Sequence, residues 1–167
     1  MNLKSFKNRA YKKRGGLIKF MKRLQRKAPK GMDALAKKMD TEVWKDIDCL
    51  ECAHCCTKMT PTYTKTDINR IAKHLGMTYQ EYFDKWCETD KDNGDIVNRI
   101  QPCQFLQKNN KCSIYAVRPA DCSGFPHFKK KDVLDYTHVY TENIHRCPAT
   151  LKWVELMEKN VIAQKII

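Results

Sequence analysis

The stretch CLECAHCC, residues 49–56, places four of the chain's nine cysteines within one short segment. The two-residue spacing between Cys49, Cys52 and Cys55 allows their thiolates to converge on one ion, as in zinc and iron–sulfur sites. A disulfide is disfavoured, because neighbours such as Cys55 and Cys56 rarely reach disulfide geometry. We therefore interpret this stretch as a metal-binding segment around which the chain folds.

The adjacent side chains of Cys55 and Cys56 are expected to point apart, which favours two metals or a polynuclear site over a single chelated ion. Further along the chain, four more candidate ligands stand in sequence contexts that indicate defined positions: Cys103, Cys112, Cys122 and Cys147. Together with the first four they are enough for two four-thiolate sites. Cys87 ends an apolar stripe beside an aromatic residue and is interpreted as a small buried hydrophobic residue instead.

Two metals remain open at this point. The spacing matches the first three cysteines of the bacterial ferredoxin run, but Met59 occupies the position of the fourth. A remote thiolate, such as Cys103 or Cys147, would have to complete a [4Fe–4S] cluster. Zinc needs only tetrahedral thiolate or imidazole ligands, and cysteine-rich sites suit it well. Both zinc and iron stay as candidate cofactors.

Positive charge is concentrated at the start of the chain. The 167 residues carry 32 Lys and Arg against 19 Asp and Glu, and residues 1–30 contain basic side chains but no acidic one. After Gly15-Gly16, apolar residues at helical spacing predict a short basic amphipathic helix. We predict an N-terminal extension at residues 1–31 and a metal-binding domain at residues 32–167. The extension would contact an anionic membrane surface, a nucleic acid or its own domain.

The remaining composition bears on the compartment. No run of about 18 consecutive apolar residues is present, which argues against a transmembrane helix, and no apolar stretch follows the charged start as in a secretory signal. A chain of this kind is expected in the cytoplasm, where thiols stay reduced.

The periodicity predicts an α+β fold that is mostly helical, with a small β-hairpin and loops organised around the cysteines. Helices are expected over residues 32–47, after a Thr66 cap, after Thr78 and Glu81 in capping-box spacing, and from Pro148 onward. The hairpin is predicted at residues 105–115, and a further strand at residues 133–140.

The order of these motifs resembles a known family. CLECAHCC, then TDINRIAKHLG, QPCQFL and KCSIYAVRPADCSGFP resemble the YkgJ-like cysteine-cluster family of zinc- or iron-chelating domains, whose pattern extends into flagellin lysine N-methylases. The resemblance spans about residues 49–147. It implies that the metal ligands are the family's eight cysteines: Cys49, Cys52, Cys55, Cys56, Cys103, Cys112, Cys122 and Cys147. It also draws attention to Arg118, which could hold a cluster thiolate or an anionic ligand.

Three functions follow as hypotheses. The first is a metal-organised module that acts through a protein partner and needs nothing beyond the cysteines. The second is an iron–sulfur-dependent enzyme related to protein lysine N-methylases, although no Gly-rich cofactor loop or spaced pair of carboxylates is visible. The third is a zinc protein that contacts nucleic acid through its basic N-terminal extension. Whether the chain is an enzyme stays open from the sequence.

Overall fold

The computed structural model describes residues 2–166 and divides the chain into two compact units. Unit 1 is formed by Met1–Cys49 together with Pro126–Ile167, and unit 2 by Leu50–Phe125. Unit 2 is therefore an insertion between the two halves of unit 1. Helices dominate and one small antiparallel sheet accompanies them, which confirms the predicted α+β, mostly helical fold class.

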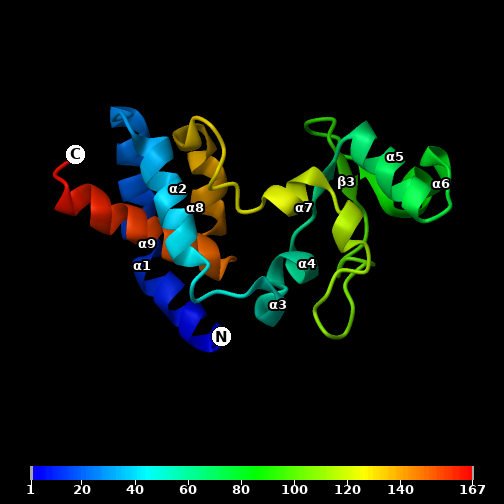
Figure 1. Cartoon of the computed structure of the whole chain (residues 1–167), viewed down its shortest axis with the longest axis horizontal. Coiled ribbons are helices and arrows are strands. Elements are labelled where there is room, and N and C mark those ends of the chain that lie inside the picture. The colour runs from blue at the N-terminus through cyan, green and yellow to red at the C-terminus, as the bar shows by residue number, and fades with distance from the viewer. Residues whose placement is uncertain (1, 167) are drawn as a thin grey trace. The chain divides into compact units, whose positions relative to one another are not determined.

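Unit 1 is a helical bundle. It contains the helices α1 (Leu3–Lys27), α2 (Met32–Val43), α8 (Thr137–Asn143) and α9 (Pro148–Ala163), and the short 3-10 helix η2 (Val133–Tyr136). The last helix, α9, packs against α1, α2 and α8, and the four lie side by side in Figure 1. Within residues 2–166, no helix combines the length and the apolar character needed to cross a bilayer.

The centre of this bundle is aromatic. Trp153 of α9 is fully buried and stacks on Phe128, with 4.7 Å between the ring centroids. Its ring centroid lies equally close to that of Tyr140. The indole nitrogen of Trp153 donates a hydrogen bond of 3.1 Å to the Ala36 carbonyl of α2. One side chain thus joins segments from both halves of unit 1.

The helix α1 is longer than the sequence pattern indicates. The prediction that Gly15-Gly16 divides it is wrong, since the helix runs from Leu3 to Lys27 without interruption. Ala10 is buried before the glycines, and Leu17 and Phe20 are buried after them, so tertiary packing holds both halves in one helix. The apolar stripe of α1 therefore packs against its own unit.

Unit 2 combines a three-stranded antiparallel sheet with short helices. Its strands are β1 (Thr62–Tyr63), β2 (Cys87–Thr89) and β3 (Ile96–Asn98), in the order β1-β3-β2. Its helices are α3 (Cys49–Cys52), which begins at the unit boundary, α4 (His54–Lys58), α5 (Lys65–His74), α6 (Tyr79–Trp86), the 3-10 helix η1 (Tyr115–Val117) and α7 (Ala120–Gly124). The core between α5, α6 and the sheet contains Ile68, Ile71 and Tyr82.

Several expected boundaries are confirmed and others are wrong. The capping box of Thr78 and Glu81 starts α6, and Pro148 starts α9, both as predicted. The cap of α5 is Thr64, two residues before the predicted Thr66.

The strands predicted from the sequence pattern are mostly absent from the described residues. The hairpin predicted at 105–115 is reduced to one bridge between Leu106 and Cys112, followed by η1. The strand predicted at 133–140 is wrong, because residues 133–143 form η2 and α8. Their alternation of apolar residues serves the core of unit 1, where Val133 and Tyr140 are fully buried.

Candidate metal centre

The cysteine-rich segment forms two very short helices, α3 and α4, joined by Ala53. Ala53 adopts a left-handed conformation with φ of 44°, which costs an L-residue about 1 kcal/mol or more. Neither helix buries a residue of its own, whereas Ala53 between them is buried. Helices of this length are marginal without tertiary packing. Another interaction is therefore needed to hold this segment in place.

The sulfur atoms of Cys55 and Cys56 lie 3.9 Å apart. The expectation that these two side chains point apart is thus wrong. Zn–S bonds of about 2.3 Å in a tetrahedron place two sulfur ligands about 3.8 Å apart. The observed separation matches that value and is far longer than a disulfide bond of about 2.05 Å. The adjacent pair is therefore compatible with shared ligation of one ion.

The backbone brings Cys103 and Cys112 to the same region. The amide of Cys103 donates to the Cys56 carbonyl over 2.8 Å, which pairs two segments far apart in sequence. The amide of Leu106 donates to the Cys103 carbonyl over 3.0 Å, and Leu106 is bridged to Cys112. A turn at Asn110, with a left-handed φ of 64°, returns the chain from Cys103 to Cys112. This small loop thus presents two thiols next to Cys56.

A buried carboxylate positions the segment that carries Cys122. Asp67 of α5 accepts a hydrogen bond from the Ala120 amide, 3.1 Å away, and another from Arg70, 2.6 Å away. Arg70 also donates to the Arg118 carbonyl over 2.9 Å. The pair therefore fixes the start of α7, two residues before Cys122. The sequence analysis did not predict this role. The capping-box spacing of Thr64 and Asp67, followed by Arg70, is the pattern that indicates it.

The electrostatics of the thiols show that they are neighbours. A hydrogen bond from the Cys55 thiol lowers the pKa of Cys56 to about 7. Burial raises the pKa of both Cys103 and Cys112, and negative charge on Cys56 raises both pKa values further. Burial likewise raises the pKa of Cys52, with a further contribution from Cys56. Ionisation of Cys56 thus opposes ionisation of Cys52, Cys103 and Cys112.

Cys122 belongs to the same electrostatic group, although the residue retains exposed surface. Its pKa is raised to about 12. Desolvation of the thiol is the largest cause, and negative charge on Asp121, Cys103 and Cys56 raises the pKa further. A divalent cation reverses this relation, since coordination to a metal deprotonates a thiol outright. The clustered thiols therefore have the chemistry of a cation site.

Arg118 lies close enough to influence this group. Its charge lowers the pKa of Cys112, against the larger effect of burial. Its guanidinium carbon stands 3.7 Å from the centre of the Tyr115 ring, and it donates to the Tyr115 carbonyl over 2.9 Å. The side chain is therefore held in place beside the thiols by a cation–π contact and a hydrogen bond.

The other three cysteines have different surroundings. Cys49 begins α3, three residues from Cys52, and is the last residue of the first segment of unit 1. Cys147 precedes α9 and packs against the core of unit 1. Cys87 is fully buried in the core of unit 2, where burial raises its pKa to about 11, so its interpretation as a buried residue is confirmed.

The donors of unit 2 fit zinc or iron in kind and number. Six thiols are linked by a sulfur–sulfur contact or by the effect of one thiol's charge on another's pKa: Cys52, Cys55, Cys56, Cys103, Cys112 and Cys122. Thiolates are the ligands that zinc and iron–sulfur centres prefer. Among residues 2–166, no three His, Cys, Asp or Glu side chains are already arranged to hold one ion. Coordination therefore requires the thiols to move closer, which helices without buried residues permit.

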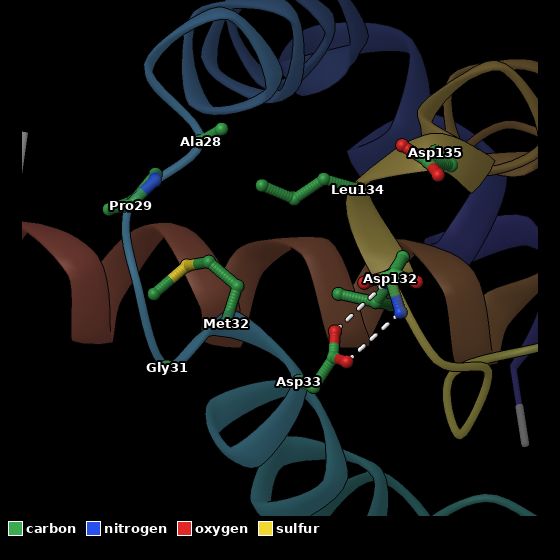
Figure 2. Close-up of a pocket in the computed structure, with 9 residues that line it drawn as sticks. Ala28, Pro29, Gly31, Met32, Asp33, Asp132, Leu134 and Asp135 are labelled. Carbon is green, nitrogen blue, oxygen red and sulfur yellow. Dashed lines mark hydrogen bonds between the residues drawn. The ribbon is translucent and has the colours of Figure 1, made fainter.

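A separate hollow of about 310 Å³ lies in unit 1 and is shown in Figure 2. It is lined by residues that follow α1 and start α2 and by the chain around η2, among them Met32, Leu134 and Asp135. Asp33 accepts hydrogen bonds of 2.9 Å from the amides of Asp132 and Val133 across it. The hollow is lined by none of the nine cysteines.

Comparisons with known proteins found a relative and a family model. An uncharacterized protein of Methanocaldococcus jannaschii is 33% identical over 81 residues, which cover 47% of this chain and 43% of that protein. The chain thus spans less than half of the length of this relative. No solved structure matches. The family model CxxCxxCC, described as a putative zinc- or iron-chelating domain, matches residues 48–148, and the chain belongs to this family.

Proposed function

We propose that unit 2 is a metal-organised module in which the six clustered thiols of unit 2 bind zinc or iron. A single tetrahedral ion uses four of them. The six therefore favour a polynuclear centre, either two ions or an iron–sulfur cluster with a neighbouring site. Cys49, one helical turn from Cys52, is the seventh candidate ligand, and Cys147 the eighth.

The observation that carries this proposal is that separate segments bring their cysteines near Cys56: the Cys103 amide donates to the Cys56 carbonyl over 2.8 Å, and Leu106 is bridged to Cys112. In agreement with this, negative charge on Cys56 raises the pKa of Cys103, Cys112 and Cys122. Neighbouring thiolates repel one another, and coordination to a divalent cation deprotonates the thiols and compensates their charge. The 3.9 Å separation of the sulfurs of Cys55 and Cys56 supports ligation of the same ion.

The metal would also supply folding free energy. The three helices that carry the first cysteines and Cys122, namely α3, α4 and α7, bury none of their own residues. Structural zinc sites contribute on the order of 10 kcal/mol to folding of small domains. Such a module acts in a reducing compartment, where its thiols stay free to coordinate, and its function is exercised through a partner.

An iron–sulfur enzyme requires a substrate site beside the thiols. The hollow in Figure 2 is lined by unit 1 residues and contains no cysteine. The clustered thiols need no substrate site to act as a metal-organised centre. The proposal of a metal-organised module therefore rests on the grouped thiols of unit 2, whereas the proposal of an enzyme related to lysine N-methylases rests on resemblance alone.

The test is metal content after anaerobic purification, with two matched variants. We expect stoichiometric zinc or iron in the unmodified chain, a clear loss in Cys56→Ala, and no loss in Cys87→Ala, which removes a cysteine from the same unit. Visible absorption with sulfide identifies an iron–sulfur centre, and a colourless zinc protein identifies a zinc centre. Equal metal loss in both variants would show that the assigned ligands are wrong.

Hydrogen exchange distinguishes a structural metal from an incidental one. After chelation, we expect faster amide exchange within residues 50–125 and unchanged exchange in α1, α2 and α9, which have their own core. Unchanged exchange throughout the chain would refute the role of metal in folding, even if metal is bound.

A further inference from the structure

The outer face of α1 carries a continuous line of positive charge. With 100° per residue, six basic side chains fall within about 60° of the direction opposite the buried Leu17. We call this set the α1 stripe: Lys4, Lys12, Lys19, Lys22, Arg23 and Arg26. All six are exposed, and α1 contains no acidic residue. From Lys4 to Arg26 the stripe extends about 33 Å at 1.5 Å per residue.

The charges of the α1 stripe are not neutralised by the protein. At the edge of the helix, Arg9 and Lys13 pair with Glu155 of α9. Among the residues that the structure describes, no ion pair involves a member of the stripe. Six uncompensated positive charges along one line therefore require a polyanionic partner or bulk counterions.

The structure argues against a membrane surface as this partner. A basic amphipathic helix binds a bilayer by burying its apolar face among the lipids. In α1 that face is already used, since Phe20 is 5% exposed, and Met21 and Leu24 are not exposed at all. The buried apolar face of α1 is therefore not available to lipids.

One aromatic side chain accompanies the α1 stripe. Tyr11 is 88% exposed, the most exposed of the large hydrophobic residues in the described part of the chain, and it directly precedes Lys12. Its helical direction lies about 60° from the centre of the stripe. Exposed aromatic rings beside a basic track are the arrangement with which proteins bind unpaired bases.

We propose that the α1 stripe binds single-stranded nucleic acid, with phosphates along the basic side chains and a base stacked on Tyr11. This binding is independent of the metal centre. It gives the predicted N-terminal extension at residues 1–31 a function distinct from that of the thiols.

The expected salt dependence follows from the number of charges. Six phosphate contacts to a single strand give a slope of about −4 in log affinity against log salt. Between about 50 and 200 mM salt, this slope corresponds to about a 300-fold loss of affinity. A variant with four of the six charges removed retains a slope of about −1.4, and loses only about sevenfold over the same range.

The experiment is fluorescence anisotropy of labelled oligo(U) and oligo(dT) of about 20 nucleotides with the full metal-loaded chain. The test variant replaces Lys12, Lys19, Lys22 and Arg26 by glutamine. The control variant removes the same charge from exposed lysines elsewhere in unit 1, by replacing Lys37, Lys38, Lys131 and Lys159 by glutamine. We expect the slope to fall in the test variant and to stay near −4 in the control.

The other outcomes overturn the proposal. Equal weakening in both variants would show that only net charge matters. Binding to phosphatidylserine vesicles without binding to oligonucleotides would assign the surface to a membrane instead. We expect Tyr11→Ala to weaken binding at least about fivefold through lost stacking. Tyr11→Ala with unchanged affinity, or equal affinity for a duplex of the same length, would refute the single-strand assignment.

Discussion

Replacing Asp67 by alanine is expected to loosen the beginnings of α5 and α7 together. The carboxylate of Asp67 is 2% exposed and accepts four hydrogen bonds. Two come from Thr64, at 3.0 Å from its amide and 2.7 Å from its hydroxyl, and the others come from Arg70 and Ala120. Removal of the side chain takes this acceptor from two backbone amides, the Thr64 hydroxyl and one guanidinium.

The magnitude follows from these contacts. Breaking a buried charge pair costs about 3–5 kcal/mol, largely because the remaining groups stay buried and unpaired. Arg70 is 40% exposed, so water replaces part of its lost interaction, which places the estimate near the lower end. We expect unit 2 to lose about 3 kcal/mol, a large share of the 5–15 kcal/mol typical of a domain.

The assay is hydrogen exchange in increasing urea, followed on peptides from residues 59–125, because unit 1 would obscure a signal from the whole chain. Glu81→Ala is the matched control, since Glu81 occupies the same capping-box position at the start of α6 but is exposed. We expect a much smaller effect there. An Asp67→Ala variant no less stable than the Glu81→Ala variant would refute the assignment of Asp67 as a positioning residue.

The pH dependence provides a second readout. Burial opposes ionisation of Asp67, but the hydrogen bonds from Thr64, Arg70 and Ala120 prevail and hold its pKa below the ordinary value of an aspartate. A group whose pKa is lower in the folded state stabilises the fold above its unfolded pKa of about 3.9. This stabilisation is lost as the pH falls through the folded pKa. Asp67→Asn should therefore weaken unit 2 at neutral pH and reduce its sensitivity to acid.

Four further substitutions, in three variants, test the packing and the backbone. Trp153→Ala should cost unit 1 about 3–5 kcal/mol in urea denaturation, because it empties the aromatic centre of the bundle; a cost below about 1 kcal/mol would contradict that packing. Replacing Gly15 and Gly16 by alanine should stabilise α1 by about 0.5–1 kcal/mol each, since an added Cβ meets no atom within 4 Å, and a lower melting temperature would count against a continuous helix. Ala53→Gly should stabilise unit 2 by about 0.5 kcal/mol by relieving its left-handed conformation, and slower hydrogen exchange around α3 and α4 would confirm it.

The sequence predicts those features of this protein that are encoded locally. The capping box of Thr78 and Glu81 and the proline that starts α9 are read directly, because each depends on a few adjacent residues. The family is identified in the same way, from cysteine spacing within short motifs. The eight-cysteine ligand set and the role of Arg118 remain predictions that the proposed metal analysis tests.

The features that escape prediction depend on contacts between distant segments. Gly15-Gly16 signals a break, but burial of residues on both sides keeps α1 helical. The strands of unit 2 have only two or three residues, too few to show alternation. The closeness of the Cys55 and Cys56 sulfurs depends on their side-chain rotamers within the short helix α4, which an ideal helical geometry does not represent. The packing of the first segment of unit 1 against its second segment depends on residues far apart in the sequence, so no local pattern predicts it.

The insertion of unit 2 into unit 1 determines the order in which the two are completed during synthesis. All of unit 2 is outside the ribosome once residue 125 has emerged, whereas the bundle of unit 1 is complete only after α9 has emerged. Domains generally fold as units as the chain emerges. The nascent polypeptide can therefore capture its metal while its first two helices still await their C-terminal partner.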